Sequence, residues 1–354
     1  MTSPVRVAVV GVGYWGPNIV RNLYENPAAE PTWVVDPNPA ARKRITLRYP
    51  AIREAASIDE VLDQDDVDAV AIVTPVSTHY DLAAKALRAG KHVFVEKPLA
   101  ASSRDAAELI GIAEARGLVL MPGHTFLYSP PVVKIKQLFD SGELGEILFV
   151  TTSRVNLGLH QPDVSVVWDL GPHDFSILRY LLDELPATVS AVSRSCVLPG
   201  IPDVAFINLS YPSGTIAHVE LSWLAPSKLR RTAIVGSRKM VVYDDTANEP
   251  VRVFDTGADL PDPGSFGEYR LTYRTGDIVS PRVDATEPLS IELAEFASAV
   301  REGHPIRSSP QVGLDVIKTI EAVERSLADG GRPTELQSGG LENNEPLPGS
   351  EARR

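Results

Sequence analysis

The chain has 354 residues, of which 44% are hydrophobic and 23% are charged, and its formal net charge at pH 7 is -12. This length allows about two domains, and the composition is that of a globular protein, not of a disordered or fibrous one. The negative charge argues against nucleic acid as the main partner, because phosphate binding requires a basic surface. The single cysteine, Cys196, excludes an internal disulfide and an all-cysteine metal site.

From the sequence we expect neither a signal peptide nor a membrane-spanning segment. No apolar run approaches the roughly 18 to 20 residues that cross a bilayer, and the first residues pass directly into a strand without room for a signal peptide. We therefore expect a cytoplasmic protein. Residues 334–354, most clearly from Gln337 onward, are rich in Gly, Glu, Asn, Pro and Ser and have almost nothing to bury, so we expect a disordered tail.

Up to residue 122, short apolar strands alternate with helices. Strands are predicted at residues 5–10, 33–36, 69–73, 93–95 and 118–121, and helices after residue 17 and at 78–89 and 104–116. The run Val5–Val10 is typical of a strand buried on both faces of a parallel sheet. This alternation predicts βαβ units, and hence an α/β domain with a doubly wound parallel sheet over residues 1–122.

The first strand runs into a glycine-rich loop that opens the first helix. Asp36 lies 20 residues beyond the last glycine of this loop, at the end of the second strand. In a dinucleotide site such glycines let the backbone approach a pyrophosphate, the helix N-terminus faces the negative charge, and the acid binds the ribose 2′-hydroxyl. The predicted cofactor contacts in this region are Gly11, Gly13, Tyr14, Trp15, Gly16 and Asp36.

Asp36 would repel a 2′-phosphate, which favours NAD over NADP as the cofactor. Arg42 and Arg44 are near enough in sequence to weaken this preference. Two other interpretations of the loop are a glycine turn that serves packing alone and a site for another nucleotide ligand, as in a methyltransferase.

Thr74-Pro75 closes a later strand, and His79 follows at the start of a helix. In a doubly wound sheet this edge lies beside the nicotinamide end of the cofactor, so all three residues are predicted cofactor contacts. The alternative is a helix cap formed by Ser77 or Thr78, and both interpretations can hold together.

Glu96-Lys97-Pro98 follows the apolar run Val93-Phe94-Val95. Ligands bind at the carboxyl ends of the strands in an open α/β sheet, and a lysine ammonium there suits proton transfer or the polarisation of an oxygen. A lysine after a strand is more often a solvated end residue, but its place in a dinucleotide fold favours a functional role. We predict Glu96 and Lys97 as cofactor contacts, with Lys97 also in catalysis and substrate binding.

Beyond Pro122 the pattern changes, and we expect a second domain over residues 123–333. Strands are predicted at 146–154, 188–195, 204–211, 215–224 and 231–243, and helices at 130–140, 174–182, 289–301 and 312–328. The alternation of polar and apolar residues over 216–223 is typical of a sheet with unlike faces.

Arg154 and Asn156 close the first strand of this second part, and either could hold a carboxylate or a diphosphate of a substrate. A second basic cluster follows later, for which solvated loop charge is the plainer interpretation. It consists of Lys228, Arg230 and Arg231.

Asp169 stands four residues before His173, just ahead of the helix predicted from Asp174. The acid can orient or charge the histidine, as a general base requires, and the helix N-terminus should lower the affinity of His173 for a proton. The plainer interpretation is that Asp169 and Asp174 cap a helix and His173 only packs. A zinc site with His124 or His160 is another option, but the sequence offers no convincing third ligand.

Together these motifs resemble the Gfo/Idh/MocA oxidoreductase family over about residues 5–333. The resemblance rests on Gly11-x-Gly13-x-x-Gly16, Thr74-Pro75 with His79, Glu96-Lys97-Pro98 and Asp169-x-x-x-His173. It implies an N-terminal Rossmann domain and a C-terminal α/β domain with an open, mainly antiparallel sheet, whose face often builds dimers or tetramers. It also implies that Lys97 lies near the nicotinamide, that Asp169 and His173 form an acid/base pair, and that Lys97-Pro98 is a cis peptide.

One departure concerns residues 123–130, where many members of the family carry one or two arginines and this chain has none. Any substrate contact that those arginines make elsewhere is in doubt here. Residues 13–18 and 168–174 resemble a branch linked to nucleotide-sugar metabolism, with C3 dehydrogenases of UDP-N-acetylglucosamine or its uronate as the nearest analogy.

We therefore predict hydride transfer between NAD and a secondary alcohol of a sugar or cyclitol, with C3 of a nucleotide-linked amino sugar as the specific option. His173, oriented by Asp169, would accept the hydroxyl proton while Lys97 stabilises the developing alkoxide. The predicted substrate contacts are Lys97, Arg154, Asn156, Asp169 and His173, and no metal is expected.

Two alternatives stay open, an NADPH-dependent 3-ketosugar reductase of deoxysugar biosynthesis and a non-catalytic NAD-binding regulatory protein. The expected partners are a small-molecule substrate and further copies of the chain, as a homodimer or homotetramer, and neither nucleic acid nor a membrane.

Overall fold

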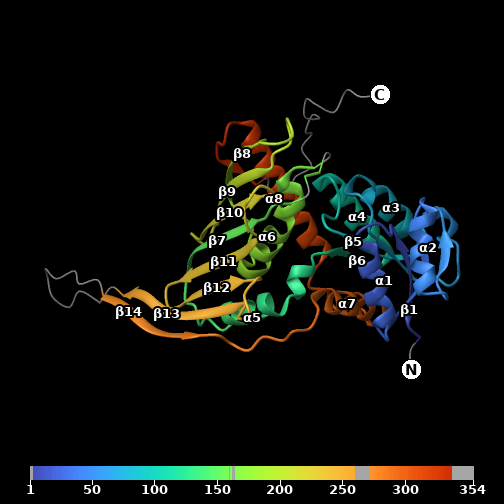
Figure 1. Ribbon diagram of the computed structural model, residues 1–354, viewed down its shortest axis with the longest axis horizontal. Coiled ribbons are helices and arrows are strands. Elements are labelled where there is room, and N and C mark those ends of the chain that lie inside the picture. Colours follow the sequence, from blue (N-terminus) through green and yellow to red (C-terminus); the bar gives the residue numbers. More distant parts are fainter. Residues whose placement is uncertain (1–2, 159, 162–163, 260–271, 337–354) are drawn as a thin grey trace.

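The computed structural model describes residues 3–158, 160–161, 164–259 and 272–336, and it contains two sheets with helices between and around them (Figure 1). The first sheet has six parallel strands in the order β3-β2-β1-β4-β5-β6, which confirms the predicted doubly wound α/β architecture. Its strands are β1 Val5–Val10, β2 Ala29–Val35, β3 Arg53–Ala55, β4 Ala69–Ile72, β5 His92–Glu96 and β6 Leu120–Gly123.

Helices cover both faces of this sheet, as its apolar strands require. Alternate residues of β1 point to opposite sides, so that Val7 and Val9 lie in one hydrophobic core and Ala8 and Val10 in another. The four helices of this part are α1 Gly16–Glu25, α2 Pro39–Arg48, α3 His79–Arg88 and α4 Ser103–Arg116. The strand order reverses between β1 and β4, and this switch point is where a doubly wound sheet opens a crevice for a ligand.

The second sheet has nine strands in the order β14-β13-β12-β11-β7-β10-β9-β8-β15. Every neighbouring pair is antiparallel except β7 and β10, so the expectation of an open, mainly antiparallel sheet is confirmed. Its strands are β7 Ile147–Val155, β8 Thr188–Arg194, β9 Val204–Ser210, β10 Ile216–Ser222, β11 Leu229–Gly236, β12 Met240–Asp244, β13 Val251–Asp259, β14 Thr272–Val279 and β15 Thr334–Glu335.

Three details of this sheet differ from the predictions. The strand predicted at 231–243 is a hairpin, because the chain turns after Gly236, whose N–H donates to the carbonyl oxygen of Lys239 at 3.0 Å. The strands β13 and β14 were not predicted. The expected tail begins with β15, which pairs with β8, and the remainder of that tail lies outside the described residues.

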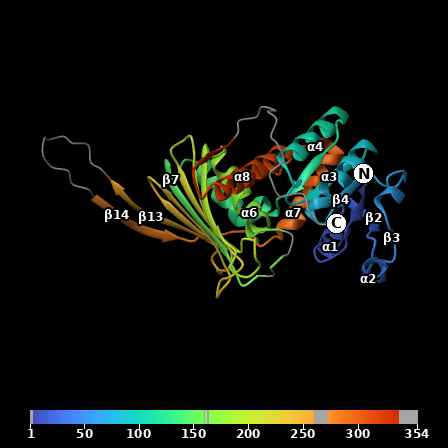
Figure 2. The same cartoon turned by 90° about the horizontal axis from the view of Figure 1, so that it is seen from above.

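One face of the second sheet packs against helices that lie between the two sheets (Figure 2). These are α6 Val166–Leu182 and α8 Pro310–Ala328, with α5 Pro130–Asp140 at one end. Helix α6 begins well before the predicted start at residue 174. Pro172 lies inside it, and since a proline interrupts the helical hydrogen bonds, the sequence pattern pointed to a later beginning.

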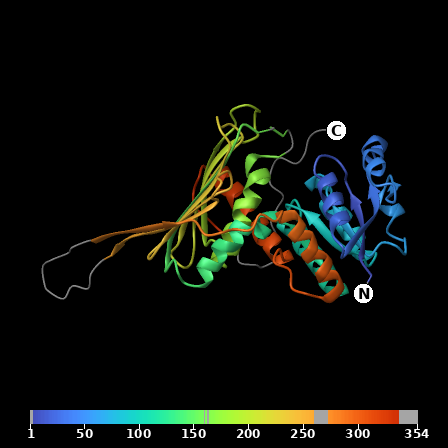
Figure 3. The same cartoon turned by 60° about the horizontal axis from the view of Figure 1, so that its bottom comes forward.

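Helix α7 Pro288–Glu302 returns to the first sheet, although it follows the second sheet in sequence (Figure 3). Leu289, Leu293 and Phe296 pack in the same core as Val7 and Val9 of β1. The domain boundary at residue 122 stays a prediction. Helix α7 follows the second sheet in sequence but packs in the core of the first one.

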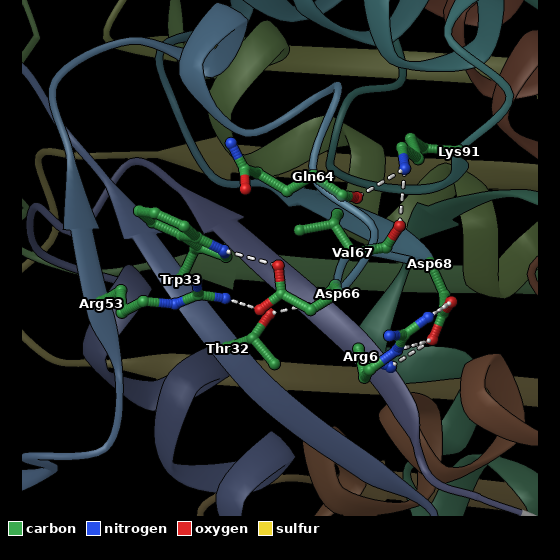
Figure 4. A network of polar contacts seen from close by, with 9 residues as sticks. All are labelled: Arg6, Thr32, Trp33, Arg53, Gln64, Asp66, Val67, Asp68 and Lys91. Atoms are coloured by element: carbon green, nitrogen blue, oxygen red, sulfur yellow. Dashed lines mark hydrogen bonds and ion pairs between the residues drawn. The ribbon is translucent and has the colours of Figure 1, made fainter.

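A polar network holds residues 64–68, which lead into β4, on the amino-terminal side of the first sheet (Figure 4). The Asp68 carboxylate accepts bonds from the Arg6 guanidinium at 2.9 and 2.6 Å and from the Arg6 backbone N–H at 2.9 Å. Lys91, just before β5, donates to two carbonyl oxygens of this segment at 2.7 and 3.2 Å. The Asp66 carbonyl oxygen accepts a bond from the Thr32 hydroxyl, and the Asp66 carboxylate contacts the Trp33 indole N–H and the Arg53 guanidinium.

Among the described residues, the helices include none that combines the length and the apolar character needed to span a membrane.

Candidate active site

The glycine loop combines two glycines that packing requires with one that faces open space. Gly11 has a φ of 91°, and a Cβ there would lie 2.5 Å from the Val73 carbonyl oxygen. A Cβ on Gly16 would lie 2.2 Å from the Gly11 carbonyl oxygen, whereas a Cβ on Gly13 would meet no atom of the described residues within 4 Å. The packing interpretation therefore explains Gly11 and Gly16, and Gly13 leaves the backbone open to an approaching phosphate at the start of α1.

Asp36 is fixed at the end of β2 by two backbone N–H groups. Its carboxylate accepts hydrogen bonds from Val12 at 3.0 Å and from Asn38 at 2.8 Å. Arg42 donates to the Asp36 carbonyl oxygen at 2.5 Å, and Arg44 donates to the carbonyl oxygens of residues 12 and 13 at 2.8 and 3.0 Å. Both guanidiniums are thus bonded to the backbone around the acid.

The two aromatic residues of the loop differ in their surroundings. Tyr14 is 94% exposed and extends into solvent. Trp15 donates its indole N–H to the Glu96 carboxylate at 2.8 Å and so joins the glycine loop to the end of β5. The sequence placed both residues near the cofactor, and only the structure revealed this link.

His79 is buried, and its two ring nitrogens lie 2.8 Å from the carbonyl oxygens of Thr74 and Pro98. A neutral ring donates only one proton, and burial lowers the pKa of His79, so one of the two contacts is weak. The cofactor contact predicted for His79 stays a prediction, and within the described residues its ring contacts two backbone carbonyl oxygens. The ring thereby ties the ends of β4 and β5 together.

Thr74 and Pro75 lie at the end of β4, as predicted. The Thr74 hydroxyl is 2.7 Å from the Thr78 hydroxyl, which donates to the Pro75 carbonyl oxygen at 2.8 Å. Thr78 directly precedes α3, but within the described residues its side chain makes no capping bond to the helix. The alternative in which Thr78 caps this helix is therefore wrong.

Lys97 reaches from the first sheet to helix α6. Its ammonium donates to the backbone carbonyl oxygen of Asp169 at 2.9 Å and lies 3.5 Å from a carboxylate oxygen of the same residue. The other carboxylate oxygen accepts the Trp223 indole N–H at 3.0 Å. The Lys97-Pro98 peptide is cis, as the family resemblance implied.

His173 is half-buried and lies edge-on to Phe126, with 4.9 Å between the ring centroids. Its Nδ1 is buried without a hydrogen-bond partner among the described residues, so Nδ1 does not form the expected bond to the Asp169 carboxylate. Burial, followed by the charges of Lys97 and Arg154, lowers the pKa of His173 well below its usual value. The expected helix N-terminus is not the cause, because His173 lies in the interior of α6.

Arg154, a predicted substrate contact, is bonded to helix α6. The side chain is almost fully buried and bonds the Asp174 carboxylate through Nε at 2.5 Å and Nη2 at 3.4 Å. Its guanidinium also lies over the Phe126 ring, 4.5 Å from the centroid. Arg154 therefore anchors α6 beside His173. Its Nη1 has no hydrogen-bond partner among the described residues, and the predicted contact of Arg154 with the substrate stays a prediction.

Asn156 lies at the end of β7, where its side chain faces Gly158, and its backbone bonds Ser222 and Ala225. Of the second basic cluster, Arg230 lies 5.8 Å from the centroid of Phe126 and bonds Asp245. Lys228 and Arg231 are exposed, in agreement with the plainer interpretation.

Two buried groups near Glu96 or Lys97 were missed as site residues. His124 directly follows β6, is 1% exposed, and has no partner for either ring nitrogen in the part of the chain that the structure describes. Burial and the Lys97 charge lower the pKa of His124 to about 3. Glu292 on α7 is fully buried and accepts a bond from Thr125 at 2.7 Å, and no described residue bonds its Oε1. The place of His124 after a strand was a usable signal, whereas nothing in the sequence around Glu292 pointed to the site.

Within the residues that the structure describes, no three His, Cys, Asp or Glu side chains are grouped so that they could hold a metal ion.

Comparison with protein families agrees with this geometry. Residues 5–124 match an oxidoreductase family with an NAD-binding Rossmann fold, and residues 132–242 match the C-terminal domain of Gfo/Idh/MocA proteins. The chain belongs to the Gfo/Idh/MocA oxidoreductase family. As a member of this family, it is an oxidoreductase whose first sheet is an NAD-binding Rossmann domain.

Several Gfo/Idh/MocA proteins are similar over most of the chain. Inositol 2-dehydrogenase of Rhizobium meliloti (strain 1021) is 27% identical over 92% of this chain and 97% of its own length. UDP-N-acetylglucosamine 3-dehydrogenase of Acidithiobacillus ferrooxidans is 29% identical over 88% of this chain and 94% of its own. The crystal structure of GenD2 from gentamicin A biosynthesis in complex with NAD has a TM-score of 0.81 and 26% identity, over 96% of this chain and 98% of that one. The match to an uncharacterized oxidoreductase of Streptococcus pneumoniae covers 61% of this chain and 62% of that protein.

Proposed function

We propose that the protein catalyses reversible hydride transfer between NAD and a secondary alcohol of a sugar or cyclitol. The observation that carries this proposal is the bond from Lys97 at the end of β5 to Asp169 on α6. Asp169 precedes His173 by about one turn of α6, so this bond brings an ammonium group of the Rossmann edge to the part of the helix that carries the imidazole. The Lys97 charge contributes to the lowered pKa of His173. The relatives named for inositol and for UDP-N-acetylglucosamine support an alcohol on a ring as the substrate.

The residues present fit a dinucleotide. The open space at Gly13 would admit the pyrophosphate, and Asp36 would accept a bond from the ribose 2′-hydroxyl. Because Arg42 and Arg44 are bonded to backbone carbonyls, they are not poised for a 2′-phosphate, which supports NAD over NADP. When bound, the nicotinamide supplies the hydride acceptor.

His173 would act as the base. Its lowered pKa keeps the imidazole neutral near pH 7, so that it can accept the hydroxyl proton. We assign this role to Nε2, because Nδ1 is the ring nitrogen that is buried without a partner among the described residues. The Lys97 ammonium would donate to the same oxygen and stabilise the alkoxide charge as it develops. Asp169, bonded to Lys97 and Trp223, would position the lysine and not the histidine.

An assay of NAD with free sugars, inositols, UDP-sugars and dTDP-sugars, followed by nicotinamide absorbance, tests this proposal. His173→Asn should lower kcat by about 10²- to 10⁴-fold on the substrate that the parent oxidises, while the thermal unfolding midpoint stays near that of the parent. A variant that turns over at the parental rate would exclude His173 as the base.

We also propose C3 of a nucleotide-linked amino sugar as the specific substrate, in line with the UDP-N-acetylglucosamine 3-dehydrogenase relative. The second candidate is reduction of a 3-ketosugar with NADPH, which a 3-reductase of a dTDP-linked deoxysugar from Saccharopolyspora spinosa favours, at 26% identity over 71% of this chain. The affinities of the parent and of Asp36→Ala for NADH and NADPH separate the two candidates. A strong preference of the parent for NADPH, unchanged in Asp36→Ala, would favour the reductase. We do not retain the non-catalytic alternative, because the chain belongs to an oxidoreductase family.

A homo-oligomer that pairs the outer faces of the second sheet is the assembly that we propose. One row of apolar residues crosses six neighbouring strands on that face, and several of its members are exposed. The row consists of Ile216, Phe149, Val235, Met240, Phe254 and Ile278. Light scattering on the parent and on Phe149→Lys tests this assembly, and an unchanged mass for the variant would contradict it.

A further inference from the structure

The Glu96 carboxylate lies where three elements of the Rossmann side meet. One oxygen accepts the Trp15 indole N–H of the glycine loop at 2.8 Å, and the other accepts the Lys97 backbone N–H at 3.3 Å. A Cβ on Gly123 of β6 would lie 3.0 Å from the Phe94 ring and 3.3 Å from the Glu96 Cα, so β6 packs closely against the end of β5 that carries this acid. The third element is α7, which brings Glu292 close enough for the Glu96 charge to raise the pKa of Glu292.

Among the described groups that surround it, Glu96 is the one that changes charge near neutral pH. Burial raises the pKa of Glu96 to about 7, although the Lys97 charge opposes this rise. Burial and the Glu96 charge raise the pKa of Glu292 well above its usual value, which favours the protonated form of Glu292. Just after β6, the pKa of His124 is about 3, which leaves that imidazole neutral. Trp15 does not titrate.

We propose that Glu96 senses the charge of the bound nicotinamide, so that the preference of the enzyme between oxidised and reduced cofactor depends on pH. This inference rests on the proposed function, because it takes NAD as the cofactor and places the nicotinamide at the strand ends beside Lys97. The oxidised ring carries a positive charge and the reduced ring carries none. An ionised Glu96 therefore stabilises the oxidised form alone.

Two effects of a bound ring on Glu96 oppose each other. The charge of the oxidised ring favours the carboxylate, whereas covering the carboxylate with the ring disfavours it. Glu96 is half-buried, and burial already raises its pKa, so further covering by the ring adds less than the new positive charge contributes, and the charge effect decides for the oxidised cofactor. For the reduced cofactor only the second effect remains. Binding of NAD⁺ should therefore release protons, and by reciprocity its affinity should rise with pH.

The dissociation constants of NAD⁺ and NADH, measured by titration calorimetry on the full chain between about pH 6 and pH 8, test this inference. We expect NAD⁺ to bind roughly three- to tenfold more tightly at the higher pH, since a shift of one pKa unit corresponds to about tenfold in affinity. NADH should bind equally well or more weakly there. Two buffers of different ionisation enthalpy should reveal proton release on NAD⁺ binding.

Glu96→Gln keeps one acceptor oxygen, enough for the Trp15 indole or for the Lys97 N–H but not for both, and it cannot ionise, so it should abolish the pH dependence for NAD⁺. The matched control is Glu184→Gln, an acid just after α6 that bonds Ser213, and it should keep the parental dependence. Trp15→Phe gives a second readout. Without the indole bond, which lowers the pKa of Glu96, the midpoint of the dependence should move to higher pH even if overall affinity falls.

Two results would overturn the inference while the proposed function stands, namely a pH-independent affinity for NAD⁺ in the parent and an unchanged dependence in Glu96→Gln. If neither NAD⁺ nor NADH binds at any pH, the cofactor assignment of the proposed function fails as well.

Discussion

The two sides of the six-stranded sheet differ in how several of their charged and titratable groups are bonded. On the amino-terminal side, Asp68 is matched by three donors from Arg6, and Lys91 by two carbonyl oxygens (Figure 4). On the carboxyl-terminal side, His124 and Glu292 are buried with atoms that no described residue bonds, and the pKa of each is displaced. A buried polar group without a partner costs stability, so such groups are expected where a ligand binds and not where strands are only held together.

Substitutions of two lysines at opposite ends of β5 test this comparison most directly. Lys97→Met should lower kcat/KM by about 10²- to 10⁴-fold, because the ammonium is expected to stabilise the alkoxide. Lys91→Met, the matched control before β5, should leave kcat/KM unchanged and lower the free energy of unfolding by about 1 kcal/mol through its two lost carbonyl bonds. Steady-state kinetics and urea unfolding of both variants measure this. Equal kinetic losses in the two would remove the distinction between the sides.

The pH profile of kcat, measured at saturating cofactor, sharpens the assignment of His173. A base must be neutral, so the rate should fall by about tenfold per pH unit only below its pKa. Burial and the charges of Lys97 and Arg154 hold that pKa well below 6.5, and hence the acid limb should lie at clearly lower pH. An acid limb centred near 6.5, that of an ordinary histidine, would contradict this site geometry.

Glu292→Gln should stabilise the protein, in contrast to most changes of a buried residue. The pKa of Glu292 is raised in the folded state, so the folded protein loses stability as the pH rises from the unfolded pKa of about 4.3 towards the folded pKa. Glutamine does not ionise, and at neutral pH the variant should gain about 1 to 3 kcal/mol in the free energy of unfolding. Unfolding curves at acid and neutral pH provide the measurement. The gain should vanish below about pH 4, and a loss at neutral pH would refute the explanation.

Asp68→Asn should have the smallest effect, since the pair with Arg6 is about one third exposed. We expect a loss of about 0.5 to 1 kcal/mol in the free energy of unfolding at neutral pH. The Arg6 hydrogen bond lowers the pKa of Asp68, so this contribution is present above the unfolded pKa and disappears as the pH falls through the folded one. Thermal unfolding of parent and variant should therefore converge in strong acid. An effect on kcat/KM is not expected.

Local patterns in the sequence were enough for the Rossmann sheet and for most of the second one. β-branched runs, glycines and prolines act over a few residues, and they placed β1, β4 and β5 as well as the glycine loop. The start of α6 was misplaced because Pro172 looked like a helix boundary, while the packing of α6 against the second sheet maintains the helix through it. The hairpin β13–β14 carries no comparable local signal.

The sequence by itself determined which residue types follow the strands. Together with the family motifs, this was enough to name Lys97, Asp169 and His173 as candidates for one site. Only the tertiary structure decided which of them bond. Asp169 and His173 share a helix face by their spacing, yet the acid bonds Lys97 and Trp223, which are 72 and 54 residues away. Local spacing limits which side chains can meet, but burial and competition among distant partners select the contacts that form, and these depend on the whole fold.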